Sequence, residues 1–336
     1  MAVFPNFSNN ITYNNIISLD NLLGAWEEFL KGKRKRKDVQ EFQMNLMDNI
    51  LTLQNELKTK TYTHGSYQAF NISDPKPRNI HKACVRDRLL HHAIYRQLYF
   101  SFDKKFIFHS YSCRRNKGTH RALGAFTKMA QKVSANHTKT CWVLKCDIKK
   151  FFASIDHKIL LNILEERITD TDVLWLLKQV IKSFHTQLSK GLPLGNLTSQ
   201  LLVNVYMNEF DKFVKHKLRM RYYVRYADDF VFLSHDCSYL MNILPQVEQF
   251  LSDTLKLSLH PHKVGIKTVA SGVDFLGWIH FPSHRVLRTT TKKRMYRGLY
   301  RAEGKNETLQ SYLGLLQHGD AHDLQQKAAD LVHTLQ

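Results

Sequence analysis

The chain of 336 residues is 43% hydrophobic, enough apolar material for a substantial core, and its formal net charge is +20. Such a positive field favours a polyanionic partner, either nucleic acid or an anionic membrane surface. No apolar run approaches the roughly 20 residues that a membrane span needs. We therefore expect a nucleic-acid partner and no membrane.

The cysteines and the N-terminal sequence bear on the compartment. The first residues, MAVFPNFSNNITYNN, lack the charged segment and apolar block of a leader. The cysteines are odd in number and form no CxxC pair, which disfavours a disulfide framework and a structural zinc site. They are Cys84, Cys113, Cys141, Cys146 and Cys237. This pattern predicts a reducing cytoplasm.

The first third of the chain predicts two helices. A basic run, KGKRKRK, at 31–37 precedes apolar residues at helical spacing from Phe42 to Leu57, and Asp38 is a candidate cap for that helix. The basic run is either a solvated connector or a phosphate contact. The stretch DPKPRNI at 74–80 is turn-rich and leads into a helix that begins near Asp87.

The middle of the chain predicts a strand between helices. Thr119 can cap a helix that follows Gly118. The segment CWVLKCD then predicts a strand ending on Asp147, and an amphipathic helix comes next. The segment GLPLGNLTSQ, 191–200, turns through Gly195 into a long helix, for which Thr198 is a candidate cap.

The segment VRYADDFVFLS, 224–234, predicts a β-hairpin. Val224 and Tyr226 on one side alternate like a half-buried strand, as do the residues after the acids, and Ala-Asp-Asp between them is turn-like. Asp228 and Asp229 then share the tip, where two like charges repel unless a cation or a shared proton is present. A polar turn without function is the alternative.

The remaining sequence predicts a helix over 239–256 and a hairpin within GVDFLGWIHF, 272–281. Seven arginines and lysines then lie between 285 and 301, with no acid before Glu303. A basic helical face suits a phosphate backbone, although a solvated surface helix has the same composition. We find no internal repeat and no low-complexity linker.

Three carboxylates lie at the ends of predicted strands: Asp147 ends the strand at 141–147, and Asp228 and Asp229 lie at the tip of the later hairpin. If these strands share a sheet, Asp147 meets Asp228 and Asp229 at one edge. Carboxylates combined with substrate phosphates are the ligands that Mg²⁺ prefers. Two such ions, about 4 Å apart, can activate an attacking 3′-oxygen and stabilise a leaving pyrophosphate. The arrangement therefore predicts nucleotidyl transfer.

Seven segments resemble the motifs of reverse transcriptases, and they occur along the chain in the order of those motifs. The palm motifs are CDIKKFFASIDH, LPLGNLTSQ, RYADDFVFLS, LSLHPHK and GVDFLGW, and the fingers motifs are DPKPRNIHKACVRDRLLHHA and FIFHSYSCRRNKGTHRAL. The resemblance covers about residues 30–285. It implies an α+β right-hand polymerase fold with fingers, palm and a short helical thumb. The implied parts are a basic N-terminal extension, 1–37, fingers and palm, 38–285, and a basic helical thumb, 286–336.

Within that superfamily the chain resembles the reverse transcriptases of diversity-generating retroelements. Most reverse transcriptases have Gln before Gly195 and Pro after Ser199, whereas this chain has Leu194 and Gln200. The segments DPKPR and SYSCRRNKGTH and the basic N-terminal run also fit this branch. Ala227 departs from the Val or Met of many relatives, which we expect to alter packing near the primer end but not the chemistry.

The resemblance implies a role for each matching residue. Asp147, Asp228 and Asp229 are the catalytic carboxylates and metal ligands, and the Ile148 carbonyl is a further ligand. The implied nucleotide contacts are Lys76, Arg78, Lys149, Lys150, Phe152, Leu194, Gly195, Gln200 and Lys263. The implied primer grip is Phe275, Leu276 and Gly277, and the contacts to the nucleic-acid backbone are Lys292, Lys293 and Arg297.

Structural alternatives exist for several of these roles. Phe152 follows Asp147 by five positions, where an aromatic side chain excludes a 2′-hydroxyl, but it can also be a core residue. Leu194 can merely pack the turn at Gly195. Core packing also explains Phe275 and Leu276, and the lysines and arginines can be ordinary surface residues.

The implied function is RNA-directed DNA synthesis by an enzyme that uses two Mg²⁺ ions, with Mn²⁺ as the alternative. The branch implies error-prone cDNA that is mutated at template adenines. The implied partners are template RNA, a DNA primer or RNA–DNA hybrid, and a small basic accessory protein (the accessory variability determinant), alone or as an oligomer. We expect no RNase H or endonuclease domain after the thumb.

Two other classes of function stay open from sequence. One is a retron, group II-intron-like or phage-defence reverse transcriptase. The other is a non-catalytic RNA-binding module, against which the intact Asp147, Asp228 and Asp229 argue.

Overall fold

The computed structural model describes residues 11–73 and 77–335, and the chain forms two compact units. Unit 1 comprises the chain up to residue 107 together with 149–217 and 250–258. Unit 2 comprises 108–148, 218–249 and 259–336. These units cut across chain order, and the boundaries of fingers, palm and thumb given above stay a prediction. Among the described residues, no helix is both long and apolar enough to cross a membrane.

Unit 1 is mainly helical. Its longest helix, α5, packs against α2 and α10, and its apolar side chains are buried on those contacts. The elements of unit 1 are α1 (Tyr13–Ile17), α2 (Leu19–Leu30), α3 (Lys37–Met44), α4 (Leu46–Lys58), β1 (Gln68–Ile72), β2 (Arg78–Lys82), α5 (Val85–Asp103), α7 (Phe151–Ser154), α8 (His157–Glu165), α9 (Thr171–Lys182), α10 (Leu197–Lys212) and a π-helical turn (Phe213–Lys217).

The strands β1 and β2 form an exposed antiparallel hairpin with Ile72 opposite Arg78. Phe70 on β1 is 44% exposed, so this hairpin contributes little to the core. Lys76, a predicted nucleotide contact, lies outside the described residues.

The helical pattern from Phe42 to Leu57 forms two helices and not one, because the backbone leaves the helical region at Asn45 (φ −118°, ψ 42°). Asp38 does not cap the first helix. It lies inside the first turn, where its carboxylate accepts hydrogen bonds from Lys82 and Arg88. Two cationic partners hold the carboxylate there, and a residue inside the helix is not in the cap position, which Arg36 occupies. The prediction of an Asp38 cap was therefore wrong.

Two other capping predictions were also wrong. The residue before the helix at Thr119 is Gly118 with φ +99°, and no side chain caps that helix. Helix α10 begins at Leu197 after Asn196 and has no side-chain cap. The helices themselves form as predicted.

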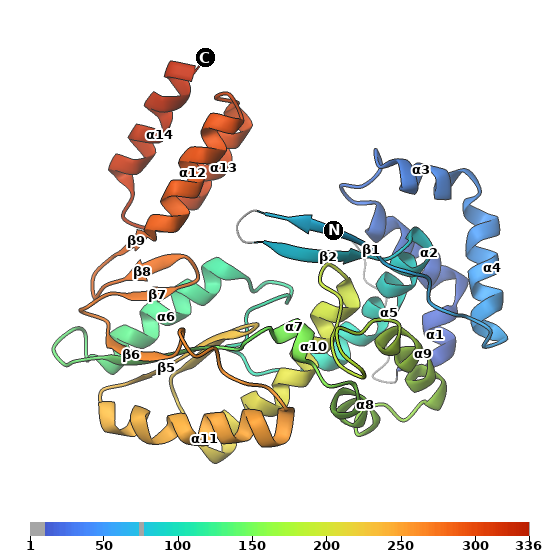
Figure 1. The fold of residues 1–336 in the computed structure, drawn as a ribbon, viewed down its shortest axis with the longest axis horizontal. Helices are drawn as coiled ribbons and strands as arrows, with labels where there is room; N and C mark the ends of the chain where they lie inside the picture. The colour runs from blue at the N-terminus through green and yellow to red at the C-terminus, as the bar shows by residue number, and fades with distance from the viewer. Residues whose placement is uncertain (1–10, 74–76, 336) are drawn as a thin grey trace. The chain divides into compact units, whose positions relative to one another are not determined.

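Unit 2 is built on a four-stranded antiparallel sheet in the order β4-β5-β3-β6. Figure 1 labels β5 and β6 of this sheet. Helix α6 packs against β4 and β5. The strands are β3 (Trp142–Asp147), β4 (Tyr223–Tyr226), β5 (Asp229–Ser234) and β6 (Gly265–Thr268), and the helices around them are α6 (Thr119–Val133) and α11 (Cys237–Leu255), whose last residues belong to unit 1. The predicted hairpin at 224–234 and the predicted strand at 141–147 are confirmed.

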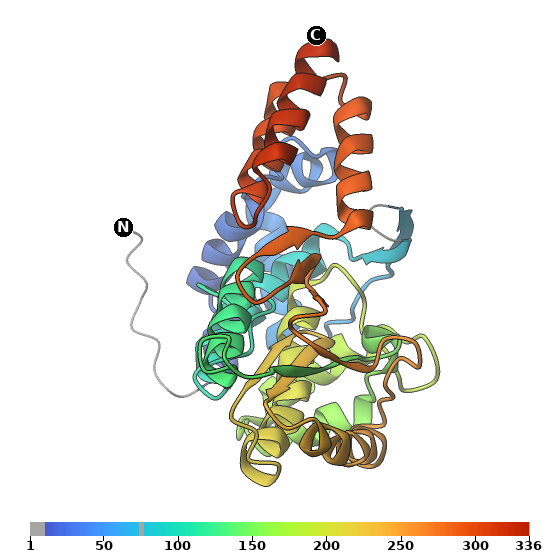
Figure 2. The same ribbon diagram turned by 90° about the vertical axis from the view of Figure 1, so that its left-hand side faces the viewer.

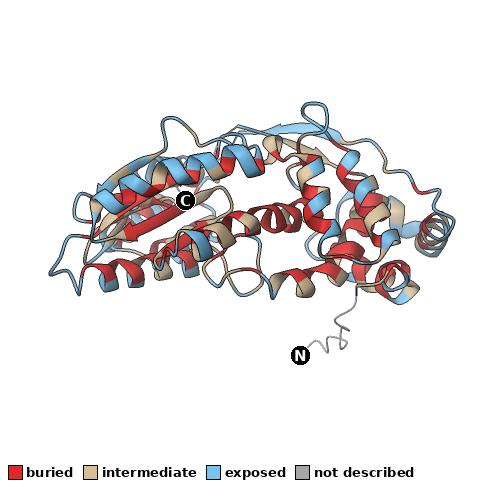
Figure 3. Ribbon diagram, turned by 90° about the horizontal axis from the view of Figure 1, so that it is seen from below, coloured by how far each residue is buried: buried red, intermediate tan, exposed pale blue. Residues whose placement is uncertain are grey.

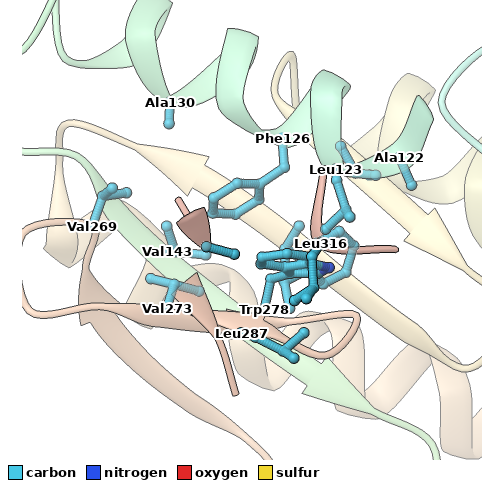
Figure 4. Packing of buried hydrophobic residues seen from close by; sticks show 14 of the residues in the cluster. Ala122, Leu123, Phe126, Ala130, Val143, Val269, Val273, Trp278, Leu287 and Leu316 are labelled. Atoms are coloured by element: carbon cyan, nitrogen blue, oxygen red, sulfur yellow. The ribbon is translucent and has the colours of Figure 1, made fainter. Parts of the chain in front are cut away.

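A second sheet of unit 2 has three antiparallel strands, β7 (Val273–Phe275), β8 (Trp278–His280) and β9 (Arg285–Leu287). The first two are the predicted hairpin, and β9 was not predicted. Figure 4 shows Phe126 and Leu123 of α6 packed with Trp278, Val143 and Leu316 in a single apolar cluster. One core therefore joins both sheets of unit 2 to its C-terminal helices.

The C-terminal helices α12 (Thr289–Arg301), α13 (Asn306–Leu316) and α14 (His322–Leu335) pack on one another (Figure 2). Met295 and Leu299 of α12 are fully buried. Lys292, Lys293 and Arg297 lie on its exposed face. Other helices of the chain, seen in Figure 3, likewise have one buried and one exposed face. The predicted basic helical segment is therefore present, with its charges available to solvent.

Candidate active site

The β4–β5 hairpin is closed by two residues, Ala227 and Asp228. Tyr226 pairs with Asp229, so Asp228 is in the turn and Asp229 is the first residue of β5. Ala227 has φ +56°, as the first central residue of a type II′ turn requires. Glycine is usual at this position, and a residue with a Cβ is held there at a cost.

Strand β3 brings the third carboxylate to this turn. In the antiparallel register Asp147 lies directly opposite Asp229. The Ile148 amide donates to the Asp228 carbonyl at 3.1 Å, and the His260 amide donates to the Asp147 carbonyl at 2.7 Å. The structure thus gathers Asp147, Asp228 and Asp229 at one end of the sheet.

The negative charges of the three neighbouring carboxylates repel one another and destabilise this end of the sheet. Like charges directly opposite each other on neighbouring strands destabilise a sheet. Two lysines partly offset this charge: Lys263 Nζ lies 2.8 Å from Asp147 Oδ1, and Lys145 Nζ lies 3.7 Å from Asp229 Oδ2. The Lys145 ammonium also donates to the Asp274 carbonyl at 2.6 Å.

The pKa of the Asp229 carboxyl is raised from its ordinary value to about 7. Burial is the main cause, Lys145 acts to lower the pKa, and the neighbouring Asp147, Asp228 and Asp274 contribute to raising it. The Oδ1 atom of Asp229 is buried and makes no hydrogen bond within the described structure. A buried acceptor without a donor costs free energy until a partner arrives. A cation is the partner that would also relieve the repulsion.

These residues fit a divalent ion that is shared with a substrate. Among residues 11–73 and 77–335, no three histidine, cysteine or acidic side chains are arranged so that they could hold a metal ion by themselves. Mg²⁺ in phosphoryl-transfer sites uses one or two carboxylates and fills its other positions with water and substrate phosphates. Asp147, Asp228 and Asp229 can supply such an incomplete set of oxygen ligands.

A buried arginine, Arg225, forms a hydrogen bond to the turn and was not singled out in the sequence. Arg225 is 0% exposed, and its guanidinium donates to the Ala227 carbonyl at 3.2 Å and to Ser110 Oγ at 3.0 Å. The Arg225 amide donates to the His109 carbonyl at 3.0 Å, and the Tyr111 amide donates to the Arg225 carbonyl at 3.0 Å. The segment around Ser110 therefore forms a brace along β4.

Lys145 was also missed by sequence reasoning. It stands two residues before Asp147 on β3, and residues two apart on a strand share one face. This period could have found it. No comparable local signal marks Arg225 or Ser110, which are 115 residues apart in the chain.

Most of the other predicted nucleotide contacts belong to unit 1. Backbone hydrogen bonds connect the segments that carry some of them. The Leu192 amide donates to the Phe152 carbonyl at 2.8 Å, and the His81 amide of β2 donates to the Leu194 carbonyl at 3.3 Å. Gly195 has φ +103°, and a Cβ at this glycine would lie 3.0 Å from Ile80 Cγ2. Phe152, the 194–195 turn and strand β2, which begins with Arg78, are thus linked in one unit.

The side chains of these residues are accessible to different degrees. Arg78, Lys149 and Lys150 are exposed. Phe152, Leu194 and Gln200 are half-buried, whereas Phe151 is 3% exposed and is a core residue. The structure therefore leaves room for the predicted contacts of Phe152 and Leu194 without establishing them.

Phe152 offers a test of sugar selection. Phe152→Ala should remove the bulk that we predict beneath the sugar and raise incorporation of ribonucleotides relative to deoxynucleotides by about tenfold or more. Competition between the two nucleotides in primer extension measures this ratio. Phe152→Tyr keeps the ring and should keep the wild-type ratio. An unchanged ratio in Phe152→Ala would make Phe152 a packing residue.

The predicted primer grip is the β7–β8 turn of unit 2. Leu276 and Gly277 have φ +50° and +87°, as both central residues of a type I′ turn require. Phe275 is 0% exposed and packs on Phe126 with ring centroids 5.6 Å apart. Phe275 thus anchors the turn in the core, and only Leu276 and Gly277 are partly accessible.

Comparison with known proteins decides the family. The family described as "Reverse transcriptase (RNA-dependent DNA polymerase)" matches residues 72–280, which include the three carboxylates and both hairpins around them. The chain belongs to the reverse transcriptase family. Members of this family generally use divalent metal ions, in agreement with the oxygen ligands gathered here.

Several curated relatives are intron-encoded. The chain is 26% identical over 258 residues to protein YkfC of Escherichia coli (strain K12), covering 66% of each chain. It is 25% identical over 301 residues to the putative COX1/OXI3 intron 2 protein of Saccharomyces cerevisiae, covering 70% of this chain and 32% of that protein. It is 24% identical over 280 residues to the group II intron-encoded protein LtrA of Lactococcus lactis subsp. cremoris, covering 62% of this chain and 44% of that protein. The chain thus spans from a third to two thirds of the length of these relatives.

A solved structure supports the fold. Telomerase from Candida albicans, in complex with a TWJ fragment of telomeric RNA, superposes with a TM-score of 0.51 at 10% identity. The match covers 74% of this chain and 51% of that chain. The predicted α+β right-hand fold of this reverse transcriptase is therefore confirmed.

Proposed function

We propose that this chain is an RNA-directed DNA polymerase that extends a DNA primer on a template RNA. The observation that carries the proposal is the register of β3 with β5, which sets Asp147 opposite Asp229 beside Asp228 in the turn. Membership of the reverse transcriptase family over residues 72–280 supports it.

In the proposed reaction the primer 3′-oxygen attacks the α-phosphorus of a deoxynucleoside triphosphate. A new phosphorus–oxygen bond forms, the bond to pyrophosphate breaks, and the 3′-hydroxyl proton passes to solvent. Two divalent ions, Mg²⁺ or Mn²⁺, would supply charge neutralisation for both oxygens when bound by Asp147, Asp228 and Asp229. Lys263 and Lys145 hold positive charge beside Asp147 and Asp229. These lysines keep the carboxylates together before substrate arrives.

Primer extension tests this function directly. The full chain is incubated with a DNA primer annealed to RNA, the four deoxynucleoside triphosphates and Mg²⁺. We expect extended primer that disappears when the ions are chelated and returns when Mg²⁺ is restored. No extension with either Mg²⁺ or Mn²⁺ would favour a non-catalytic RNA-binding module.

We further propose that the enzyme belongs to a diversity-generating retroelement and makes cDNA with errors at template adenines. The support is the resemblance of LGNLTSQ, with Leu194 and Gln200, to that branch. This proposal includes a small basic accessory protein as a partner. It also places the enzyme in a reducing cytoplasm, because all five cysteines are unpaired. The intron-encoded relatives support the alternative of a group II-intron-like enzyme.

Leu194→Gln tests the adenine bias. A Gln can form a directional hydrogen bond beside the nascent pair, which a misaligned pair loses, whereas Leu tolerates displacement. One net hydrogen bond of about 0.5–1.5 kcal/mol gives roughly 2- to 13-fold discrimination. We therefore expect fewer errors at adenine by that factor and nearly unchanged errors elsewhere, measured by sequencing cDNA made on one RNA.

The chain offers a matched control in Leu188→Gln, since Leu188 is 91% exposed in a neighbouring loop. This variant should copy adenine with wild-type errors. If Leu194→Gln does the same, Leu194 packs its turn and does not set fidelity.

A further inference from the structure

A basic and aromatic groove lies on unit 2 along the outer face of α6. The groove has a volume of about 620 Å³ and is lined by α6, by the segment from Phe108 to Lys117, and by Arg221 and Tyr222 before β4. The predicted catalytic and nucleotide-binding residues do not line it. We call it the α6 groove.

The lining segments carry charge of a single sign. Residues 108–146 contain eight arginines and lysines and no acid, and residues 218–227 contain three arginines and no acid. Along α6, Arg121, Lys128 and Lys132 are exposed at helical spacing on one face. Gly124 lies between Arg121 and Lys128 on the helix and also lines the groove, where it has no side chain to fill the space between these cations.

Aromatic rings stand beside these cations. The Phe108 side chain is 70% exposed, which is unusual for so large an apolar group. Lys117 Nζ lies 3.5 Å from the centre of the Phe108 ring and donates to the Phe108 carbonyl at 2.8 Å. Arg221 lies over the Tyr222 ring at 5.4 Å. A cation thus covers one face of each ring, and the groove offers cations for phosphates together with the remaining exposed surface of Phe108 for a base.

We propose that the α6 groove binds a single-stranded segment of RNA outside the polymerase active site. Cationic grooves with stacking aromatic side chains are the usual means of holding single strands. Arg121, Lys128 and Lys132 contact successive phosphates, and a base stacks on Phe108. An acidic peptide would satisfy the cations but would leave the exposed ring without a flat partner.

The groove is separate from the catalytic carboxylates within unit 2. Arg221 and Tyr222 precede β4, whereas Asp228 follows it. The four residues of β4 between them span roughly 13 Å. An RNA strand in the groove would therefore contact the protein at a second place, in addition to the active site. In the proposed reaction the template RNA is present before any DNA product has been made. This is why we assign the groove to RNA and not to the DNA product.

Gly124→Glu is the decisive variant. A Cβ at Gly124 meets nothing within 4 Å, so a larger side chain fits without disturbing the helix. The carboxylate would repel a phosphate in the groove, and Gly124→Gln is the uncharged analogue of the same shape. Gly314→Glu on α13, where a Cβ also meets nothing within 4 Å, makes the same change in net charge elsewhere on unit 2.

The measurement is binding of a fluorescently labelled, unstructured RNA of about 30 nucleotides to the full-length chain. We expect Gly124→Glu to weaken binding about tenfold or more, Gly124→Gln to weaken it less, and Gly314→Glu to leave it near wild type. Phe108→Ala should weaken binding by about 5- to 150-fold, the range for loss of one stacked base. Extension of a short primer–template should be unchanged in all four variants.

Salt dependence and a DNA probe complete the test. Each phosphate contact to a single strand contributes about 0.7 to the slope of log affinity against log salt. Lys128→Gln with Lys132→Gln should therefore flatten the slope by about 1.4. RNA affinity that is unchanged in both Gly124→Glu and Phe108→Ala would overturn the proposal and leave the groove to an acidic protein. Tighter groove-dependent binding of single-stranded DNA of the same sequence would overturn the assignment to RNA.

Discussion

Asp228→Asn is expected to reduce primer extension by at least about a hundredfold. The substitution keeps the size of the side chain but removes a negative charge from the predicted metal ligands. Ions at such a site supply several kcal/mol of stabilisation to the transition state. Each 1.36 kcal/mol changes the rate tenfold. Single-turnover extension at saturating primer–template measures the loss.

The fold should tolerate this change. The backbone of Asp228 forms the bond that joins the turn to β3, because its carbonyl accepts from the Ile148 amide at 3.1 Å. An asparagine keeps that carbonyl and is common in tight turns. RNA affinity should therefore remain near the wild-type value. Removing one charge from a repelling group can even raise the melting temperature slightly.

Asp323→Asn provides the matched control, because the Asp323 side chain is 94% exposed on α14 of the same unit. It makes the same chemical change and should leave extension unaltered. Extension by Asp228→Asn at the level of Asp323→Asn would exclude Asp228 as a metal ligand.

The central elements of the candidate site were predictable because their signals are local. Alternating apolar residues around Ala227-Asp228 specify a hairpin, and β3 is a short apolar strand that ends on Asp147. Once both are strands of one sheet, the antiparallel register places Asp147 opposite Asp229. Sequence order and strand period were enough to bring the three carboxylates together.

The missed features depend on contacts between distant segments. Asp38 was predicted as a helix cap, but Lys82 and Arg88 attract its carboxylate. The break at Asn45 and the strand β9 have no periodic signature of their own. A resemblance to a family transfers the roles of motif residues but does not reveal which residues brace them.

The second large effect concerns that brace. Arg225→Lys is expected to reduce primer extension by about a hundredfold, although Arg225 touches no reacting group in the proposed mechanism. Its guanidinium reaches both the Ala227 carbonyl and Ser110 Oγ, at 3.2 and 3.0 Å. A lysine has a single ammonium and cannot reproduce this planar fork. The turn would then lose a bond that holds Ala227 at φ +56°.

A small displacement of the turn is enough for such a loss. Misplacement of catalytic groups by about 1 Å can cost a hundredfold in rate. Relaxation of Ala227 away from its left-handed conformation would redirect the next residue, Asp228. The expected signature is a lower maximal rate together with a higher Mg²⁺ concentration at half-maximal extension, since the displaced carboxylate would bind the ion less well.

Ser110→Ala separates positioning from stability. It removes one acceptor of the Arg225 guanidinium and leaves the bond to Ala227, so a net hydrogen bond worth about 0.5–1.5 kcal/mol is lost from folding. We expect Ser110→Ala to lower the melting temperature but to retain the wild-type Mg²⁺ requirement. Arg225→Lys should shift the Mg²⁺ requirement even when assayed well below its melting temperature. If both variants lose stability and neither changes that requirement, Arg225 holds the fold together without positioning the catalytic turn.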